Sequence, residues 1–192
     1  MVREPSEKKS PKRQEQRDAI IRALADHVLQ AGLGETSLRQ LASAAGVSNR
    51  MLLYYFKDKA EVLHLTLMQI VTDLAELAGA TREGGRLLTP SEAFNSLADL
   101  SRDKALRPYM TVWIEISAKA ARGHTPYVGI AAEIAQRFIS WLEASLDTED
   151  PKQRKLDAAM ILSMVDGLTL LSMSVKTSQI RAAQKKMAAL LR

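Results

Sequence analysis

The stretch "LASAAGVSNRMLLYYF", residues 41–56, contains two short apolar segments separated by Gly46. Apolar residues precede Gly46, and Leu52, Leu53 and Phe56 follow it. We expect these three to face inward, with Leu52 and Phe56 about one helical turn apart. Gly46 suits the positive φ of a sharp turn, and Ser48 can cap the helix that follows. The stretch therefore predicts two short helices joined by a tight turn, which is the layout of a helix-turn-helix.

The second predicted helix carries the side chains that a DNA-reading helix uses. Ser48, Asn49 and Arg50 lie in its first turn, where Arg fits the acceptor pair on a guanine edge and Asn fits adenine. Tyr54 and Tyr55 follow one turn later, and each phenol offers a hydroxyl for a phosphate and a ring for a thymine methyl. The alternative is an ordinary helical corner with Tyr54 packed inside.

Positive charge gathers at this end of the chain. Residues 1–59 contain 11 Lys or Arg against 7 Asp or Glu, a net of +4, whereas the remainder contains 16 against 15, a net of +1. This asymmetry is expected of a nucleic-acid contact, although a solvated basic tail produces the same count. Residues 1–12 have little to bury and predict a disordered arm. The basic residues that this arm and its continuation offer to phosphates or a minor groove are Lys8, Lys9, Lys12, Arg13 and Arg17.

The whole chain beyond the arm reads as helical. Apolar residues recur every three or four positions from Arg13 to Gly32, and again in a long helix that Asp58 can cap and that ends near Gly79. The short helix between these two can be capped by Thr36 or Ser37. Proline and glycine positions predict further helices over about 90–104, 105–122, 126–146, 152–175 and 178–191. No segment alternates with period 2, so we expect an all-α protein.

Residues 36–63, "TSLRQLASAAGVSNRMLLYYFKDKAEVL", resemble the DNA-binding segment of the tetracycline-repressor (TetR) family of bacterial transcriptional regulators. The residues on the family pattern are Thr36, Leu38, Leu41, Ala42, Ala45, Gly46, Val47, Ser48, Leu52, Tyr55, Phe56 and Lys59. The resemblance implies a disordered basic arm at 1–12 and a three-helix helix-turn-helix domain at 13–58. A long helix would join this domain to a helical ligand-binding and dimerisation domain at 59–192.

The resemblance also implies a set of DNA contacts. The candidates for contacts to the DNA backbone are Ser37, Ser48, Tyr55 and Lys59, and those for base reading are Asn49, Arg50, Met51 and Tyr54. Leu53 stands where relatives commonly have a DNA-contacting tyrosine. Whether Tyr54 and Arg50 compensate for it is an open question at this point.

Two C-terminal segments indicate an interface between subunits. Apolar residues at helical spacing over 126–146 and 156–175 give more apolar surface than one small domain needs, and small residues let a partner helix approach closely. Together with the resemblance, this predicts a homodimer through Phe138, Trp141, Met160, Gly167, Leu168 and Leu171. The same helices would alternatively form the core of a monomer.

A ligand pocket is expected among the helices after the long linker helix. Its candidate residues are Phe94, Tyr109, Met110, Trp113, Glu115 and Met164, with Met68, His124, Trp141 and Asp166 as further ones. Trp113 with Tyr109 one turn earlier is the first choice, and Glu115 suits a cationic or hydroxylated ligand. Met and Trp at helical spacing are equally ordinary packing residues.

Enzyme and membrane functions have little support. There is no cysteine, the three histidines have no metal-ligand spacing, and no glycine-rich phosphate loop or nucleophile elbow occurs. We expect no catalytic residue, no metal and no cofactor. No apolar run approaches the ~20 residues of a membrane span, so a cytoplasmic protein is expected. We interpret the acidic cluster of Asp147, Glu149 and Asp150 as part of a solvated loop.

The sequence therefore predicts a cytoplasmic, homodimeric DNA-binding regulator, more a repressor than an activator. It would bind a palindromic double-stranded operator and be released by an unidentified small-molecule effector. The alternative is a DNA-binding structural or interaction protein whose C-terminal domain docks a protein partner and senses no metabolite. A closed, filled C-terminal domain would favour that alternative, whereas a cavity of several hundred Å³ would favour the sensor.

Overall fold

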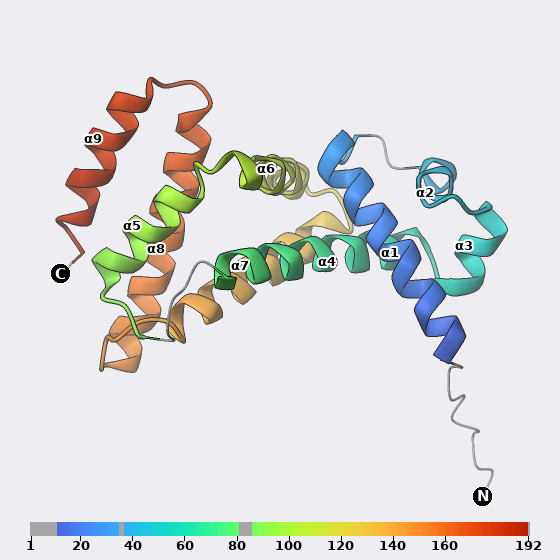
Figure 1. Ribbon diagram of the computed structural model, residues 1–192, viewed down its shortest axis with the longest axis horizontal. Coiled ribbons are helices and arrows are strands. Elements are labelled where there is room, and N and C mark those ends of the chain that lie inside the picture. Colours follow the sequence, from blue (N-terminus) through green and yellow to red (C-terminus); the bar gives the residue numbers. More distant parts are fainter. Residues whose placement is uncertain (1–10, 35–36, 81–85, 192) are drawn as a thin grey trace, which may run out of the picture. The chain divides into compact units, whose positions relative to one another are not determined.

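The protein consists of two compact helical units divided between Ile70 and Val71 (Figure 1). The structure, a computed structural model, describes residues 11–34, 37–80 and 86–191. The first unit contains α1 (Pro11–Ala31), α2 (Leu38–Ala44), α3 (Asn49–Tyr55) and the beginning of α4 (Lys59–Ala80). Helix α4 crosses the division, which lies later than the expected boundary at 58/59. The reason is that Val62, Leu63 and Leu67 are buried and extend the apolar interior of the first unit.

Pro11 and Lys12, which the sequence places in the N-terminal arm, belong to a helix. Helix α1 begins at Pro11 rather than at Arg13, since proline is favoured in the first turn of a helix, where its missing N–H costs nothing. Residues 1–10, which include Lys8 and Lys9, lie outside the described residues.

Local chemistry fixes the helix-turn-helix as the sequence predicts. The Ser37 hydroxyl accepts a hydrogen bond from the Gln40 amide and the Gln40 side chain accepts one from the Ser37 amide, which together form a capping box. Gly46 has a φ of 67°, a conformation that costs a side-chain-bearing residue energy. The Ser48 hydroxyl then accepts a hydrogen bond from the Met51 amide at 3.1 Å and starts α3.

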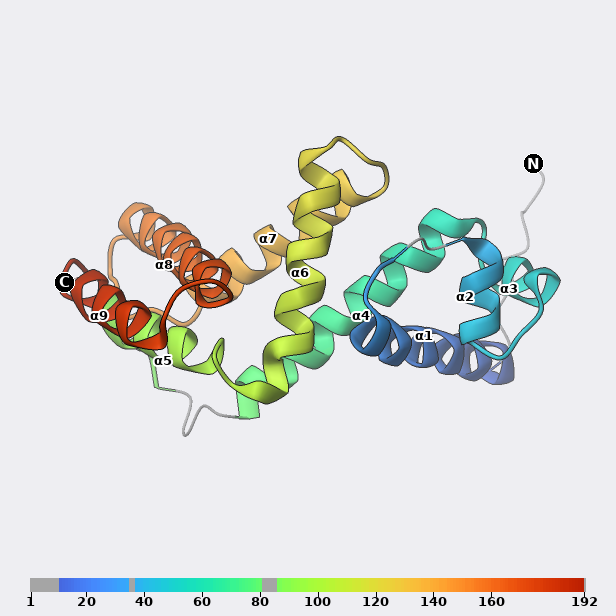
Figure 2. The ribbon, with the colours of Figure 1, turned by 90° about the horizontal axis from the view of Figure 1, so that it is seen from above.

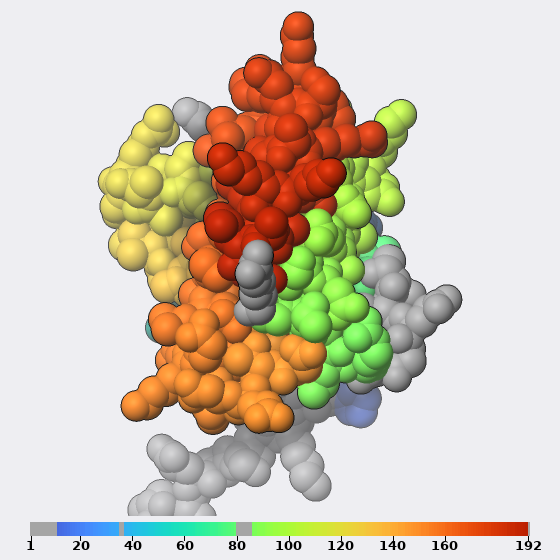
Figure 3. Space-filling view, turned by 90° about the vertical axis from the view of Figure 1, so that its left-hand side faces the viewer, coloured from blue at the N-terminus to red at the C-terminus, as the bar shows by residue number. Residues whose placement is uncertain are grey.

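The second unit packs α5, α8 and α9 around a common core (Figure 2). Its helices are α5 (Pro90–Leu100), the 3-10 turn η1 (Lys104–Leu106), α6 (Arg107–Ala121), α7 (Tyr127–Glu143), α8 (Pro151–Ser172) and α9 (Thr177–Ala188). Helix α7 packs on α6 and on α8. Figure 3 shows α9, in dark red, between α5 in light green and the orange-to-red α8. The predicted helix over 90–104 ends at Leu100 because Asp103 caps η1.

The described residues form no β-strand, as predicted, and carry an isolated parallel bridge between Leu88 and Leu146. By length and apolar composition, residues 59–79 of α4 pass a test for a membrane-spanning helix, contrary to the expectation that no segment would. Half of that window is buried inside the protein, as in the core helix of a water-soluble fold. In the loop before α8, Asp147 and Glu149 are exposed, and Asp150 caps the helix.

Candidate functional site

Helix α3 has a buried and an exposed face. Leu52 is fully buried and Phe56 nearly so, which anchors the helix in the first unit. The residues of its exposed side are Asn49, Arg50, Met51, Leu53 and Tyr54. Tyr54 is 60 % exposed, so the corner does not bury this ring, as the alternative interpretation of the sequence would require. An amide, a guanidinium, a thioether and a phenol thus point outward from one short helix.

Arg13 of α1 contacts both the backbone carbonyl and the ring of Tyr54. Its Nη2 donates a hydrogen bond to the Tyr54 carbonyl at 3.3 Å, and its guanidinium carbon lies 5.1 Å from the centroid of the Tyr54 ring. The Tyr55 ring meets the Tyr54 ring edge to face with the centroids 5.1 Å apart. This arrangement restricts the Tyr54 side chain while leaving it exposed. Sequence reasoning missed it, because Arg13 and Tyr54 are 41 positions apart.

Two further α1 side chains fasten the end of α3 and the start of α4. The Tyr55 hydroxyl is hydrogen bonded to Gln16, so its proton is already donated within the unit. The Arg17 Nη2 lies 2.5 Å from a Glu61 carboxylate oxygen, and the Arg17 guanidinium stacks 5.1 Å from the Phe56 ring centroid. Arg17 is therefore a brace inside the unit, rather than the extended phosphate contact that the sequence suggested.

The start of α4 is capped from within the protein. Asp58 accepts a hydrogen bond from the Glu61 amide at 2.9 Å, as the sequence predicts, and Glu61 accepts one from the Lys57 amide at 2.6 Å. These carboxylates occupy the positive end of the helix. A phosphate near Lys59 would therefore meet an exposed ammonium group and two nearby acidic side chains.

Comparison with known proteins shows which family this helix-turn-helix resembles. Residues 20–65 match the model of bacterial regulatory proteins of the tetR family. The chain is 28 % identical to the HTH-type transcriptional regulator BetI of Cronobacter sakazakii over 164 residues, 80 % of this chain and 77 % of that protein. The family model and these relatives support a TetR-family transcriptional regulator, with the DNA-binding domain of that family at residues 20–65. It is therefore a DNA-binding helix-turn-helix protein.

Solved structures of similar fold extend over both units. A transcriptional regulator from Rhodococcus sp. has a TM-score of 0.68 at 23 % identity and covers 91 % of this chain and 95 % of its own. A TetR-family regulator from Cytophaga hutchinsonii has a TM-score of 0.71 at 16 % identity and covers 98 % and 96 % of the two chains. The second unit of this TetR-family chain therefore shares the fold of theirs, although the sequence resemblance was detailed only in the first third.

The second unit brings two of the expected ligand residues together. The carboxylate of Asp166 on α8 is hydrogen bonded to the side chain of Trp113 on α6, and burial raises the pKa of Asp166 above its ordinary value of 3.8 despite that hydrogen bond. Tyr109, Met110 and Glu115 are half-buried on the same helix as Trp113, and His124 is exposed near its end. The half-buried pair of Trp113 and Asp166 can offer a ligand an aromatic ring and an anionic or neutral acceptor.

Some ligand candidates lie in the packed core instead. Phe94 is fully buried in the cluster of α5, α8 and α9, so it is a core residue and not a free pocket wall. Met164 and Trp141 pack against the same cluster. Met68 is buried in the first unit. Helical spacing alone could not separate these packing roles from ligand contact, because it identifies an apolar face and not what covers it.

The dimer candidates on α8 fall on opposite faces of that helix. Leu168 is 2 % exposed and belongs to the core, so its expected interface role is wrong. Met160, Gly167 and Leu171 are exposed, together with Leu156 and Leu170, which the sequence analysis did not select. A Cβ atom on Gly167 would meet nothing within 4 Å. On α7, Phe138 is half-buried.

Proposed function

We propose that this TetR-family regulator is a cytoplasmic, homodimeric repressor that binds a palindromic operator and is released from it by a small-molecule effector. The supporting observation is the exposed face of α3, where Asn49, Arg50 and Tyr54 stand on a helix anchored by Leu52 and Phe56. A helix anchored in this way fits a major groove with its free side chains toward the bases. The proposal assigns no catalytic role, metal, cofactor or membrane contact to the chain.

Base reading is assigned to Asn49, Arg50, Met51 and Tyr54. Leu53, which is 49 % exposed, offers only an apolar contact, such as one to a thymine methyl. Tyr54 compensates for the missing tyrosine at 53, since Arg13 restrains it in an exposed position. Arg50 supplies the bidentate donor pair for a guanine edge.

Contacts to the DNA backbone are assigned to Ser37, Ser48 and Lys59. Both serine oxygens already accept cap hydrogen bonds, yet each hydroxyl retains its own proton to donate to a phosphate. The Lys59 ammonium is exposed. Tyr55 joins this set only if its hydroxyl leaves Gln16, so its main role here is to brace α3.

The DNA-binding proposal is tested on the operator itself, which is obtained by selecting genomic fragments with the purified protein. Arg50→Ala should cost ~1 to 3 kcal/mol on the cognate duplex and relax specificity at one position. Lys59→Ala should weaken cognate and scrambled duplexes equally and reduce the salt dependence by about one ion. Arg122→Ala, which removes an exposed charge from the second unit, is the control. Unchanged binding by both α3 and α4 variants would refute this docking.

Homodimerisation is assigned to the exposed stripe of α8, defined as Leu156, Met160, Gly167, Leu170 and Leu171. Gly167 lies seven residues after Met160, Leu156 lies four before Met160, and Leu170 and Leu171 lie three and four after Gly167, so all five share one side of α8. They leave apolar surface uncovered on a helix whose opposite face is in the core. A second copy of the chain is the occupant, because two copies must present their α3 helices to successive major grooves ~34 Å apart.

The dimer is tested by light scattering at micromolar concentration. Leu171→Glu should shift the protein toward monomer and weaken operator binding, since it places a charge in an apolar contact. Leu87→Glu is the matched control, because Leu87 is similarly exposed but lies outside the stripe. A monomeric wild-type protein would remove both the dimer and the palindromic operator from the proposal.

The effector is assigned to the side of the second unit where Trp113 meets Asp166. A ligand with a cationic or hydroxylated group would pair with Asp166 while its apolar part contacts Trp113 and Tyr109. Helix α4 belongs to both units, so a change in the packing of residues 71–80 is transmitted along a continuous helix to Lys59.

The effector site is tested with a fluorescent reporter already in the chain. Trp141→Phe leaves Trp113 as the sole tryptophan, so compounds can be screened by its quenching. A true effector should quench Trp113 and release the operator, and Asp166→Asn should weaken both responses together. A compound that releases the operator equally well from wild type and Asp166→Asn would move the effector site elsewhere.

A further inference from the structure

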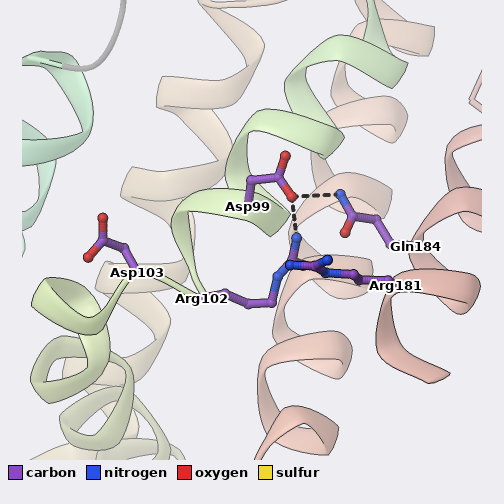
Figure 4. A pocket seen from close by; sticks show the side chains of 5 residues that line it. All are labelled: Asp99, Arg102, Asp103, Arg181 and Gln184. Carbon is purple, nitrogen blue, oxygen red and sulfur yellow. Dashed lines mark hydrogen bonds and ion pairs between the residues drawn. The ribbon is translucent and has the colours of Figure 1, made fainter. Parts of the chain in front are cut away.

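A polar cleft of about 590 Å³ opens where the end of α5 meets α9 (Figure 4). Its walls are Asp99, Arg102, Asp103, Arg181 and Gln184. None of these residues belongs to the DNA-binding face, the α8 stripe or the Trp113–Asp166 pair. The second unit thus contains a charged cleft that is separate from its expected ligand residues, which were largely aromatic.

The acidic groups of the cleft are already engaged. The Asp99 carboxylate accepts from Arg102 Nη2 and from Gln184 Nε2, the latter at 3.2 Å (Figure 4). The Asp103 carboxylate caps η1 by accepting from the Ala105 amide at 2.8 Å. Neither carboxylate is therefore poised to bind a cation.

The unused groups of the cleft are hydrogen-bond donors. Arg102 Nη1 is buried and has no acceptor among the described residues, which is costly for a charged group. Arg181 is exposed and forms no hydrogen bond or ion pair within the described part of the chain. Figure 4 shows the side chains of Arg102 and Arg181 extending toward each other from the end of α5 and from α9. Asp99 balances the charge of Arg102, so Arg181 is the cation of the cleft that has no carboxylate partner among the described residues.

A buried glutamine lies at the base of this arrangement. Gln184 is 7 % exposed, and its amide nitrogen donates to Asn95 and to Asp99, which fixes the side chain across α5 and α9. Asp99 in turn holds Arg102. Arg102 is thus pre-oriented, whereas the exposed Arg181 is free to close over a ligand, and such pre-orientation lowers the entropy cost of binding.

We propose that this cleft binds a small oxyanion, a carboxylate or a phosphate, between the guanidinium groups of Arg102 and Arg181. Guanidinium groups present paired N–H donors that match the oxygens of either anion. The volume admits inorganic phosphate as well as a small organic acid. This site is independent of the effector proposed above, because it shares no residue with it.

The test is calorimetric titration of the full-length protein with inorganic phosphate and, separately, with succinate, at constant ionic strength set by sodium chloride. Arg181→Gln and Lys186→Gln each remove one positive charge from exposed positions on α9, but only Arg181 lines the cleft. We expect Arg181→Gln to weaken binding at least tenfold and Lys186→Gln to leave it within twofold. The anion that binds identifies the ligand class.

Two results would overturn the site. One is a wild-type protein that binds neither phosphate nor succinate beyond the chloride background, and the other is an equal loss in the two α9 variants. Thermal melting of Arg181→Gln without anion checks that the fold is retained. Operator binding of Arg181→Gln without anion should match wild type, so a failure of this site stays distinct from a failure of the DNA-binding proposal.

Discussion

Each unit contains a half-buried arginine paired with a carboxylate, and the two pairs differ in what surrounds them. Arg17 is paired with Glu61 and lies against the Phe56 ring, so its guanidinium closes the interior of the first unit. Arg102 is paired with Asp99 but borders an open cleft beside a second arginine. Both retain a buried nitrogen without a hydrogen-bond partner among the described residues. The first pair is covered by an aromatic ring, whereas the second lies in the wall of a cleft.

The largest expected effects come from the two buried phenylalanines, Phe56 in the first unit and Phe94 in the second. Each change to alanine should cost ~3 to 5 kcal/mol by removing a buried ring and leaving a cavity. Because both tryptophans lie in the second unit, tryptophan fluorescence should report Phe94→Ala strongly and Phe56→Ala weakly. Circular dichroism should detect both losses, and identical fluorescence midpoints for the two variants would contradict separate units.

The two units should lose different amounts of stability when the paired arginine is replaced by methionine. Arg17→Met should destabilise the first unit by about 1 to 3 kcal/mol, because it removes an ion pair, a charged hydrogen bond and the stacking on Phe56. Arg102→Met should cost less, since Gln184 still donates to Asp99 and the Asp99 carboxylate is more exposed to water than that of Glu61. Urea unfolding followed by circular dichroism measures both. A larger loss for Arg102→Met would reverse the comparison.

Alanine substitutions at two glycines compare the effect of backbone strain with the effect of a change on an exposed helix surface. Gly46→Ala should cost about 1 to 2 kcal/mol, because a φ of 67° strains a residue with a Cβ. Gly167→Ala lies in a helix interior with open space around the new Cβ, so it should stabilise the folded subunit by about 0.5 to 1 kcal/mol. If α8 forms the dimer, the same change should weaken subunit association in light scattering, which separates the two effects.

The smallest expected effect is a pH-dependent gain from Asp166→Asn. Burial raises the folded-state pKa of Asp166 above its unfolded value, so the folded state binds the proton more tightly. The stability of the wild type therefore falls as pH rises from 3.8 through the folded-state pKa. Asparagine keeps an acceptor for Trp113 without the charge, so the variant should melt higher near pH 8 and lose that advantage toward pH 4. A gain independent of pH would contradict a buried charge as its cause.

Local signals made the first unit predictable from sequence. Ser37, Gly46 and Ser48 act on amides or φ angles within a few residues, so their caps and turn follow from spacing alone. Leu52 and Phe56 were correctly predicted on the inward side of α3, but the same prediction was wrong for Leu53, which is 49 % exposed because it lies on a different side of the helix. What spacing missed was α1, whose Arg13, Gln16 and Arg17 reach α3 and α4 from about 40 residues away and stabilise them through side-chain contacts.

In the second unit, sequence patterns gave less information about whether a residue belongs to the core, a pocket or an interface. Phe94 and Leu168 have the residue types of a pocket and an interface, but both are core residues, because the face of a helix that is covered depends on its neighbours. The cleft of Arg102 and Arg181 could not be predicted from the sequence, since its walls come from α5, the residues just after it and α9. Only the three-residue spacing of Asp99 and Arg102 hinted at a pair.

By itself, the sequence determined the all-α class, the helix-turn-helix and its caps, and the outward set Asn49, Arg50 and Tyr54, because these depend on contacts within one or two helical turns. The tertiary structure decided which apolar helix faces are buried, how α1 fastens the reading helix, and where the charged cleft opens. Those features need side chains that are distant in the chain to meet, and helical spacing contains no information about their partners.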